Sequence, residues 1–295
     1  MKLSFLSVVT LLATASQLGA QTASDYQNAV NSQSPTYHFT FDNTWTDSVG
    51  GSLTLTAAGT GFAADSFGNS SSAASFIGST DSLSTGTDLG AGGGPTGGNA
   101  AATGTGSLSL LFRTLDSTAP SGQRFLFAQG NTTANKNAFS MFIENTSNTD
   151  PSALKLRVGD KTTTIFPLAS FSADTWYYFA MTYDETRDSL GGGEIRYSIG
   201  QAGGTLTSGT IDIGNVAVVG DNGTFTVGNS AVGASSSFRN PGNGEIDELA
   251  LWNRELSAGE ISTDFAALSP VPEPASLALL GVGLAIVALR RKIAV

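Results

Sequence analysis

The chain has 295 residues with no cysteine and one histidine, and its 24 acidic residues outnumber its 14 basic ones. The lack of cysteine excludes disulfides, thiolate metal sites and thiol nucleophiles, and a single histidine, His38, leaves almost no material for a zinc site or a serine protease triad. The acidic balance argues against nucleic acid or acidic lipid as a partner, because phosphate binding depends on clustered Lys and Arg.

The first twenty residues have the pattern of a secretion signal. Lys2 gives a positive start, Leu3 to Ala15 is an apolar run interrupted only by small hydroxyl residues, and small residues end the segment at Ala20. The run is shorter than the roughly 20 apolar residues that a membrane-spanning helix needs. We therefore predict a removable signal peptide over residues 1–20.

A second targeting pattern occupies residues 271–295. The motif Pro272-Glu273-Pro274 precedes a short uncharged stretch, and Arg290, Arg291 and Lys292 follow it, which predicts a short apolar helix with its basic end in the cytoplasm. This order resembles the PEP-CTERM sorting signal of Gram-negative envelope proteins. The resemblance implies processing by an exosortase-like membrane protease, transient inner-membrane contact, and a final place in the cell envelope or outside the cell. An ordinary single-span anchor is the alternative, although such spans are normally longer.

Residues 21–270 have the size of one all-β domain. Without the two end segments, 10 basic and 23 acidic residues remain, a net charge of minus 13, which makes divalent cations better candidate partners than anions. Short β-branched and aromatic runs alternate with Gly, Asn, Asp and Ser clusters, the pattern of antiparallel strands and turns. So many strands predict two packed sheets. The predicted strands are residues 36–41, 52–56, 75–77, 107–113, 124–129, 139–144, 154–158, 162–166, 176–183, 194–199, 216–219, 224–227 and 245–252.

Three segments stand apart from these strands. Residues 84–106 are mostly Gly, Ala, Thr and Asn, and we predict a flexible surface insertion because they offer little apolar surface to offset their ordering entropy. Residues 257–268 begin with a capping box, Ser257 and Glu260, followed by apolar residues at helical spacing, which predicts a short helix. Asp221-Asn222-Gly223 predicts a tight hairpin. No other long helical period appears between the two ends.

Four segments resemble the laminin-G-like branch of the concanavalin A-like lectin and glucanase jelly rolls. They are residues 37–51 (from Tyr37-His38-Phe39 to Gly50-Gly51), 107–113, 174–184 and 244–257 (Gly244-Glu245-Ile246-Asp247-Glu248 onward), and the last two are the most specific. The resemblance covers most of residues 36–268 and implies a two-sheet antiparallel jelly-roll sandwich. The cysteine pair of true laminin G domains is missing. In such a fold the opening and closing strands lie near each other.

The expected closeness of the opening and closing strands suggests a metal site. Alternation predicts that Tyr37, Phe39 and Phe41 face the core with Asp42 at the strand end, and that Asp247 shares a side with the apolar residues that follow it. A buried carboxylate needs a cation or several donors. Members of this superfamily often hold structural Ca²⁺ here, so the resemblance implies a calcium site of Asp42, Asp247 and backbone carbonyls, with Asn43 as a weaker ligand. The alternative is that Asp247 accepts backbone N–H bonds from a neighbouring loop.

A catalytic role for the last strand is the more specific alternative to a binding role. Glu245 and its neighbours are similar to the Glu-x-Asp-x-x-Glu of jelly-roll β-glucanases, but the last acid of that pattern falls at Ala250. Retaining hydrolysis needs two carboxyls about 5 Å apart, and no other predicted strand offers such a pair. The sequence therefore favours a protein that is not an enzyme, and a glycoside hydrolase remains the second alternative.

Binding is the function that the fold supports best. Trp45 lies in a predicted loop between Asn43 and Asp47, where an aromatic platform with planar polar neighbours suits a saccharide. A loop Trp equally serves to pin the loop to the sandwich. Trp176 and Trp252 lie in strand patterns and are predicted to be packing residues, and His38 is predicted on the strand surface. We expect an exported, non-catalytic module that contacts polysaccharide or glycoprotein, with a purely structural matrix protein as the first alternative.

Overall fold

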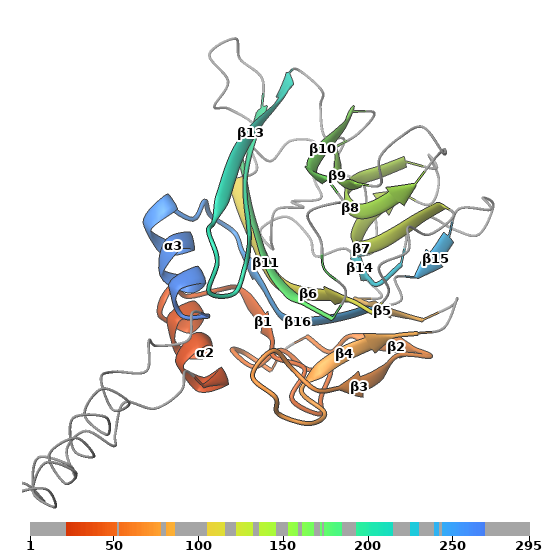
Figure 1. Ribbon diagram of the computed structural model, residues 1–295, viewed down its shortest axis with the longest axis vertical. Helices are drawn as coiled ribbons and strands as arrows, with labels where there is room; N and C mark the ends of the chain where they lie inside the picture. Colours follow the sequence, from red (N-terminus) through yellow and green to blue (C-terminus); the bar gives the residue numbers. More distant parts are fainter. Residues whose placement is uncertain are drawn as a thin grey trace, which may run out of the picture.

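The computed structural model describes residues 22–51, 53–77, 81–85, 105–115, 122–131, 136–145, 153–158, 161–167, 172, 174–184, 193–214, 225–229, 239–241 and 244–268. These residues form two β-sheets that pack face to face, with two helices against the outer side of one sheet (Figure 1). The predicted all-β, two-sheet jelly-roll sandwich with a short C-terminal helix is confirmed.

The sheet that carries the helices, here called the helix-bearing sheet, has the strand order β13-β12-β11-β6-β16-β4-β3, with β1 also paired to β16. Its strands are antiparallel neighbours throughout. Their bounds are β1 (Tyr37–Phe39), β3 (Gly61–Ala63), β4 (Ala73–Phe76), β6 (Thr105–Thr114), β11 (Trp176–Asp184), β12 (Gly193–Gln201), β13 (Thr207–Gly214) and β16 (Gly244–Trp252).

The second sheet has the order β10-β9-β8-β7-β14-β5-β2. The short strand β15 pairs with β7 in parallel, and every other pairing in this sheet is antiparallel. Its strands are β2 (Thr56–Ala58), β5 (Ser82–Ser84), β7 (Gly122–Asn131), β8 (Lys136–Asn145), β9 (Ala153–Val158), β10 (Lys161–Pro167), β14 (Phe225–Val227) and β15 (Arg239–Pro241).

Most predicted strands fall within one or a few residues of an observed one. The exception is residues 52–56, where an isolated bridge between Thr46 and Thr54 precedes β2. Strands β3, β5, β13 and β15 were not predicted, because Gly, Ala, Ser and Thr dominate β3, β5 and β13 and β15 is a short Arg-Asn-Pro segment. The predicted strand 216–219, the hairpin at 221–223 and nearly all of the predicted insertion 84–106 lie outside the described residues, as do the predicted signal peptide 1–20 and the sorting segment 271–295.

The main core lies between the two sheets. Phe39 and Phe41 face it with about 1% exposure or less, as alternation predicts, and Tyr37 packs half-buried at its edge. Strand β1 pairs with β16, with Tyr37 opposite Leu251 and Phe39 opposite Leu249. The opening and closing strands are therefore direct neighbours, as the jelly-roll resemblance implies.

Two helices cover the outer side of the helix-bearing sheet (Figure 1). The predicted helix is α3 (Ala258–Ala266), with Ser257 and Glu260 forming the expected capping box. The other, α2 (Ala23–Ser32), was not predicted, although Thr22 and Asp25 form a capping box at its start. Both helices bury apolar side chains on this side of the sheet, so a second apolar cluster forms outside the main core. None of the described helices is long and apolar enough to cross a membrane.

Candidate functional site

A β-bulge in the last strand determines where its acidic residues lie. Ile246 and Leu249 both contribute to the core between the sheets, although they are three residues apart. The pairing of β16 with β6 shifts register between Asp247 and Ala250, and Glu248 has a left-handed φ of 51°. A β-bulge inserts one extra residue into a strand, which explains why two core-facing residues lie three positions apart here. Asp247 therefore points away from the side of Leu249 and Leu251, and its predicted position on their side is wrong, because strict alternation fails at a bulge.

Glu248 lies at the centre of a buried polar network beneath α2. Its Oε2 atom lies 2.7 Å from Nε2 of His38, and its Oε1 atom accepts a hydrogen bond of 2.8 Å from Gln27 of α2. The other ring nitrogen of His38 lies 2.8 Å from Oδ1 of Asn31, also on α2. Burial raises the pKa of Glu248, and the hydrogen bond from His38 opposes that shift. The predicted surface position of His38 is wrong, because α2 covers that side of β1 and leaves the histidine fully buried.

Asp247 and Asp42 are the two carboxylates suggested for calcium. Asp247 is fully buried, its Oδ1 atom accepts from the backbone N–H of Glu248, and its Oδ2 atom has no hydrogen-bond partner. Burial, followed by the nearby carboxylates of Glu248, Asp65 and Asp42, raises the pKa of Asp247. Asp42 is exposed and accepts a hydrogen bond from Gln27. An orphaned buried oxygen suits a cation, but among the described residues no group of three or more His, Asp or Glu side chains is assembled to hold one. Two carboxylates and backbone carbonyls are therefore the available donors.

Glu245 is engaged in an ion pair. Its carboxylate accepts from the guanidinium of Arg113, the residue directly opposite it on β6, and both side chains are largely shielded from solvent. The Arg113 guanidinium also lies 5.1 Å from the centroid of the Trp176 ring. This pairing leaves Glu245 with a structural partner where a glucanase nucleophile would need to face its substrate.

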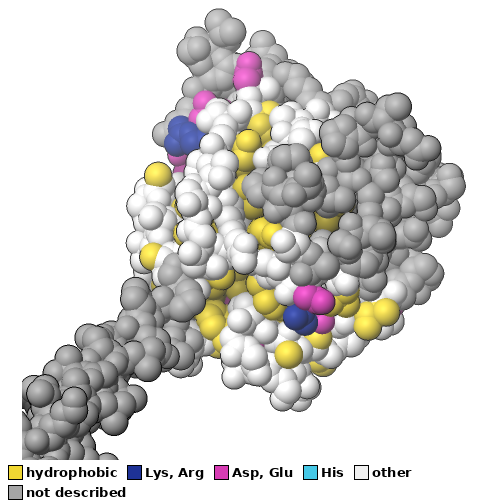
Figure 2. Space-filling model, in the orientation of Figure 1, with side chains coloured by type: hydrophobic (Ala, Val, Ile, Leu, Met, Phe, Trp, Pro, Cys, Tyr) yellow, Lys and Arg dark blue, Asp and Glu magenta, His cyan; other side chains and the backbone are white. Residues whose placement is uncertain are grey.

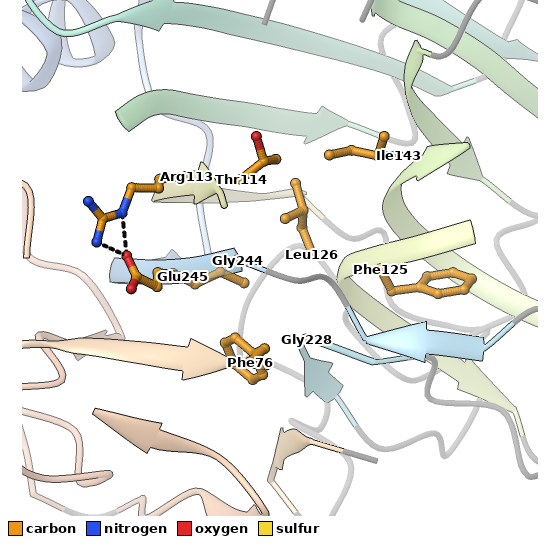
Figure 3. A pocket seen from close by; sticks show the side chains of 10 residues that line it. Phe76, Arg113, Thr114, Phe125, Leu126, Ile143, Gly228, Gly244 and Glu245 are labelled. Atoms are coloured by element: carbon orange, nitrogen blue, oxygen red, sulfur yellow. Dashed lines mark hydrogen bonds and ion pairs between the residues drawn. The ribbon is translucent and has the colours of Figure 1, made fainter. Parts of the chain in front are cut away.

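A small cavity lies beside this ion pair. It opens among Phe76, Leu126, Ile143 and the glycines Gly228 and Gly244, with Arg113 and Glu245 at its side (Figure 3). Its volume is about 20 Å³, which is room for about one water molecule. This cavity is too small to take a sugar ring.

The loop after β1 holds the three residues suggested for ligand binding. Asp47 is 3% exposed, and its carboxylate accepts backbone N–H bonds from His38, Val49 and Gly50. Asp47 thus fixes the loop through three backbone hydrogen bonds. Asn43 is exposed with a left-handed φ of 54°, and its N–H donates to Ser71.

Trp45 is half-buried at the edge of the sandwich. Its ring stacks on Phe62 of β3 with centroids 4.0 Å apart and meets Phe41 edge-on at 6.0 Å. The ring pins the loop to the sandwich, which was one of its two interpretations, and part of it remains accessible together with Phe62. Phe62 was missed because β3 has no alternating pattern. The other tryptophans lie as predicted, with Trp252 buried and Trp176 half-buried.

A larger groove lies on the outer side of the helix-bearing sheet, between β11–β13 and α3. Its volume is about 260 Å³. Hydroxyl side chains and a guanidinium line the strands, and Leu206, Leu256 and Ile261 form an apolar wall. No pattern in the sequence predicted this groove, because its residues come from three strands, a helix and their flanking loops, which only the fold brings together.

Comparison with known proteins agrees with this architecture. A family model of the concanavalin A-like lectin/glucanases superfamily matches residues 78–262, and a model of the PEP-CTERM protein-sorting motif matches residues 270–292. No curated protein sequence matches the chain. The sorting motif indicates that the protein is exported.

Solved structures share the fold at low sequence identity. The binding domain of botulinum neurotoxin serotype D superposes with a TM-score of 0.52 at 12% identity, covering 80% of this chain and 52% of that domain. A Trypanosoma rangeli sialidase mutant with trans-sialidase activity superposes with a TM-score of 0.54 at 13% identity, covering 89% of this chain and 39% of the sialidase. The chain thus spans about half of the toxin domain and less of the sialidase. With the family model matching more than half of its length, the chain belongs to the concanavalin A-like lectin/glucanases superfamily, and it carries a PEP-CTERM sorting motif.

Proposed function

We propose that this protein is an exported, non-catalytic module that contacts the saccharide of a polysaccharide or glycoprotein in the cell envelope or extracellular space. The observation that carries the proposal is the half-exposed aromatic pair of Trp45 and Phe62, together with the exposed amide of Asn43 in the same loop as Trp45. Aromatic surface packs against the C–H face of a sugar ring, and an amide both donates to and accepts from sugar hydroxyls. Asp47 supports the contact by holding the loop that carries Trp45, because its carboxylate accepts backbone N–H bonds from that loop and from β1.

The surface and the fold support this role. On the face drawn in Figure 2, the described surface is mostly uncharged, with few acidic or basic side chains. A structure with the same fold is described as the botulinum neurotoxin serotype D ligand-binding domain in complex with N-acetylneuraminic acid, with a TM-score of 0.50 at 11% identity. That ligand belongs to the toxin, and the likeness supports only the capacity of the fold to bind sugars.

The positions of the acidic residues favour binding over hydrolysis. Glu245 is paired with Arg113, and Glu248 is buried against His38 and α2. A retaining glycosidase needs two carboxyls about 5 Å apart that flank an accessible bond. Reducing sugar released from a β-glucan by the purified domain, and lost in the Glu245→Gln variant, would instead establish the glucanase alternative.

Structural calcium is proposed as the cofactor. Asp247 and Asp42 would hold the ion with backbone carbonyls, and the ion would neutralise the buried carboxylate of Asp247. The remaining partner is an exosortase-like membrane protease that acts on the tail, with Pro272, Glu273 and Pro274 as its motif and Arg290, Arg291 and Lys292 on the cytoplasmic side during transient anchoring.

A glycan array with the folded domain tests the proposal. We expect reproducible binding to at least one class of glycan, weakened about ten-fold by Trp45→Ala. A matched control is Trp176→Phe, because Trp176 packs against the apolar cluster outside the main core and not against the main core as Trp45 does, and this variant should leave binding unchanged. If the wild-type domain binds neither neutral nor acidic glycans, the result would favour a purely structural matrix protein.

A further inference from the structure

We infer that the groove between β11–β13 and α3 is a second binding site, which takes an uncharged sugar ring with vicinal hydroxyl groups. The inference deepens the proposed function and depends on it. No residue of this groove belongs to the Trp45 loop.

The polar side of the groove is built from two rows of side chains across the sheet. Thr182, Arg196 and Thr210 are direct cross-strand neighbours on β11, β12 and β13. Ser198 and Ser208 form the next row, and their hydroxyls lie 2.8 Å apart. Thr182 and Ser198 are buried at the base of the groove, whereas Ser208 and Thr210 are exposed at its rim. Each hydroxyl offers one donor and two acceptor positions, the complement that sugar hydroxyls need.

Among the described residues that line the groove, Arg196 carries the one positive charge, and a carboxylate neutralises it. Arg196 donates from Nε to Oε1 of Glu194 at 2.7 Å, and the terminal guanidinium nitrogens have no partner among the described side chains. The pair places unused N–H donors beside a carboxylate acceptor. Two adjacent hydroxyls match that arrangement, since one accepts from the guanidinium while the other donates to the carboxylate.

The surrounding charges select against an acidic ring. The carboxylate of Glu194 lies against the guanidinium of Arg196 at the edge of the groove. A carboxylated sugar that reached this guanidinium would lie beside the Glu194 carboxylate, and like charges in contact weaken binding. An uncharged ring meets no such penalty.

The opposite wall suits the apolar face of a pyranose. Leu206 is the partly exposed residue of this wall, and Leu256 and Ile261, which are 3% and 5% exposed, support it from the apolar cluster at the helices. The volume of about 260 Å³ lies just below the roughly 300 to 1,000 Å³ of ordinary ligand pockets. The groove therefore fits one or two sugar rings.

Titration calorimetry with the folded domain tests the inference, using cellotriose and maltotriose as neutral probes and trigalacturonate as the acidic probe. We expect a neutral trisaccharide to bind and trigalacturonate to bind at least ten-fold more weakly. Ser208→Leu should fill the rim and reduce affinity at least ten-fold, and Arg196→Met should reduce it by a similar factor. Thr164→Leu places the same bulk on an exposed position of β10 in the second sheet and should change nothing.

The variants separate this inference from the broader proposal. Loss of binding in Trp45→Ala with full binding in Ser208→Leu would overturn the groove site and leave the saccharide role standing. Equal binding of trigalacturonate would overturn the selection of uncharged rings. No binding of any probe by the wild-type domain would overturn the groove site, whereas the glycan array would still decide the proposed function.

Discussion

Nε2 of His38 lies 2.7 Å from Oε2 of Glu248, and this contact joins the opening strand of the helix-bearing sheet to the bulge in its closing strand. Both side chains are essentially excluded from solvent. The pair also holds α2 against the sheet, because Asn31 of α2 contacts His38 and Gln27 of α2 donates a hydrogen bond to Glu248. Removal of either partner leaves the other buried without its hydrogen bond.

His38→Ala is expected to lower the free energy of unfolding by about 3 kcal/mol, because breaking a buried pair leaves the remaining charged group uncompensated. Urea denaturation followed by circular dichroism measures the change. His38→Gln keeps a donor near Glu248 and should recover part of the loss. A loss below about 0.5 kcal/mol in His38→Ala would show that the contact does not hold the two strands and α2 together.

The stability of the domain should fall as pH rises from about 4 to 7. Burial raises the pKa of Asp264 from 3.8 to about 7, against the hydrogen bond from Gln33. The unfolded chain releases this proton near pH 4 and the folded chain near pH 7, so the contribution is fully present below pH 4 and is lost by pH 7. Three units of pKa correspond to at most about 4 kcal/mol.

Thermal unfolding at several pH values checks this prediction. The melting temperature of the wild-type domain should fall between pH 5 and pH 7.5, and Asp264→Asn should flatten the curve because an amide does not titrate in this range. The raised pKa of Asp247 acts in the same direction, so some slope should persist in the variant. Identical slopes in both proteins would contradict the role of Asp264.

Calcium should raise the melting temperature relative to chelator, because an ion that binds only the folded state stabilises it. The effect should grow with pH, since the raised pKa of Asp247 makes metal binding compete with a proton. Asp247→Asn should abolish the shift and Asp42→Asn should weaken it. Equal melting temperatures with calcium and with chelator would show that Asp247 is neutralised by its proton alone.

Gly228 should tolerate no side chain. It has a φ of +78°, and a Cβ atom there would lie 2.1 Å from the ring of Phe76. Gly228→Ala is therefore expected to lower the free energy of unfolding by about 2 kcal/mol or more, through overpacking and backbone strain. Gly61→Ala is the matched control, because a Cβ at Gly61 meets nothing within 4 Å. Equal stability of the two variants in urea denaturation would contradict this account.

The local sequence was sufficient to predict most strands and α3. The alternating apolar patterns of β11 and β16 and the capping box at Ser257 depend only on residues that are close together in the sequence. Helix α2 has a capping box of the same kind at Thr22, but its weakly apolar sequence does not stand out until the sheet beneath it provides a partner.

The candidate sites depend on contacts between distant segments. Two adjacent residues, Asp247 and Glu248, are both buried on the side of β16 away from the main core because a bulge interrupts its alternation. Trp45 is half-buried because β3 presents Phe62 to its ring. Sequence by itself determined the class of fold, the adjacency of the opening and closing strands, and the sorting motif, since these follow from local patterns and family likeness. Only the tertiary structure decided which polar side chains are free, because burial and pairing arise from residues far apart in the chain.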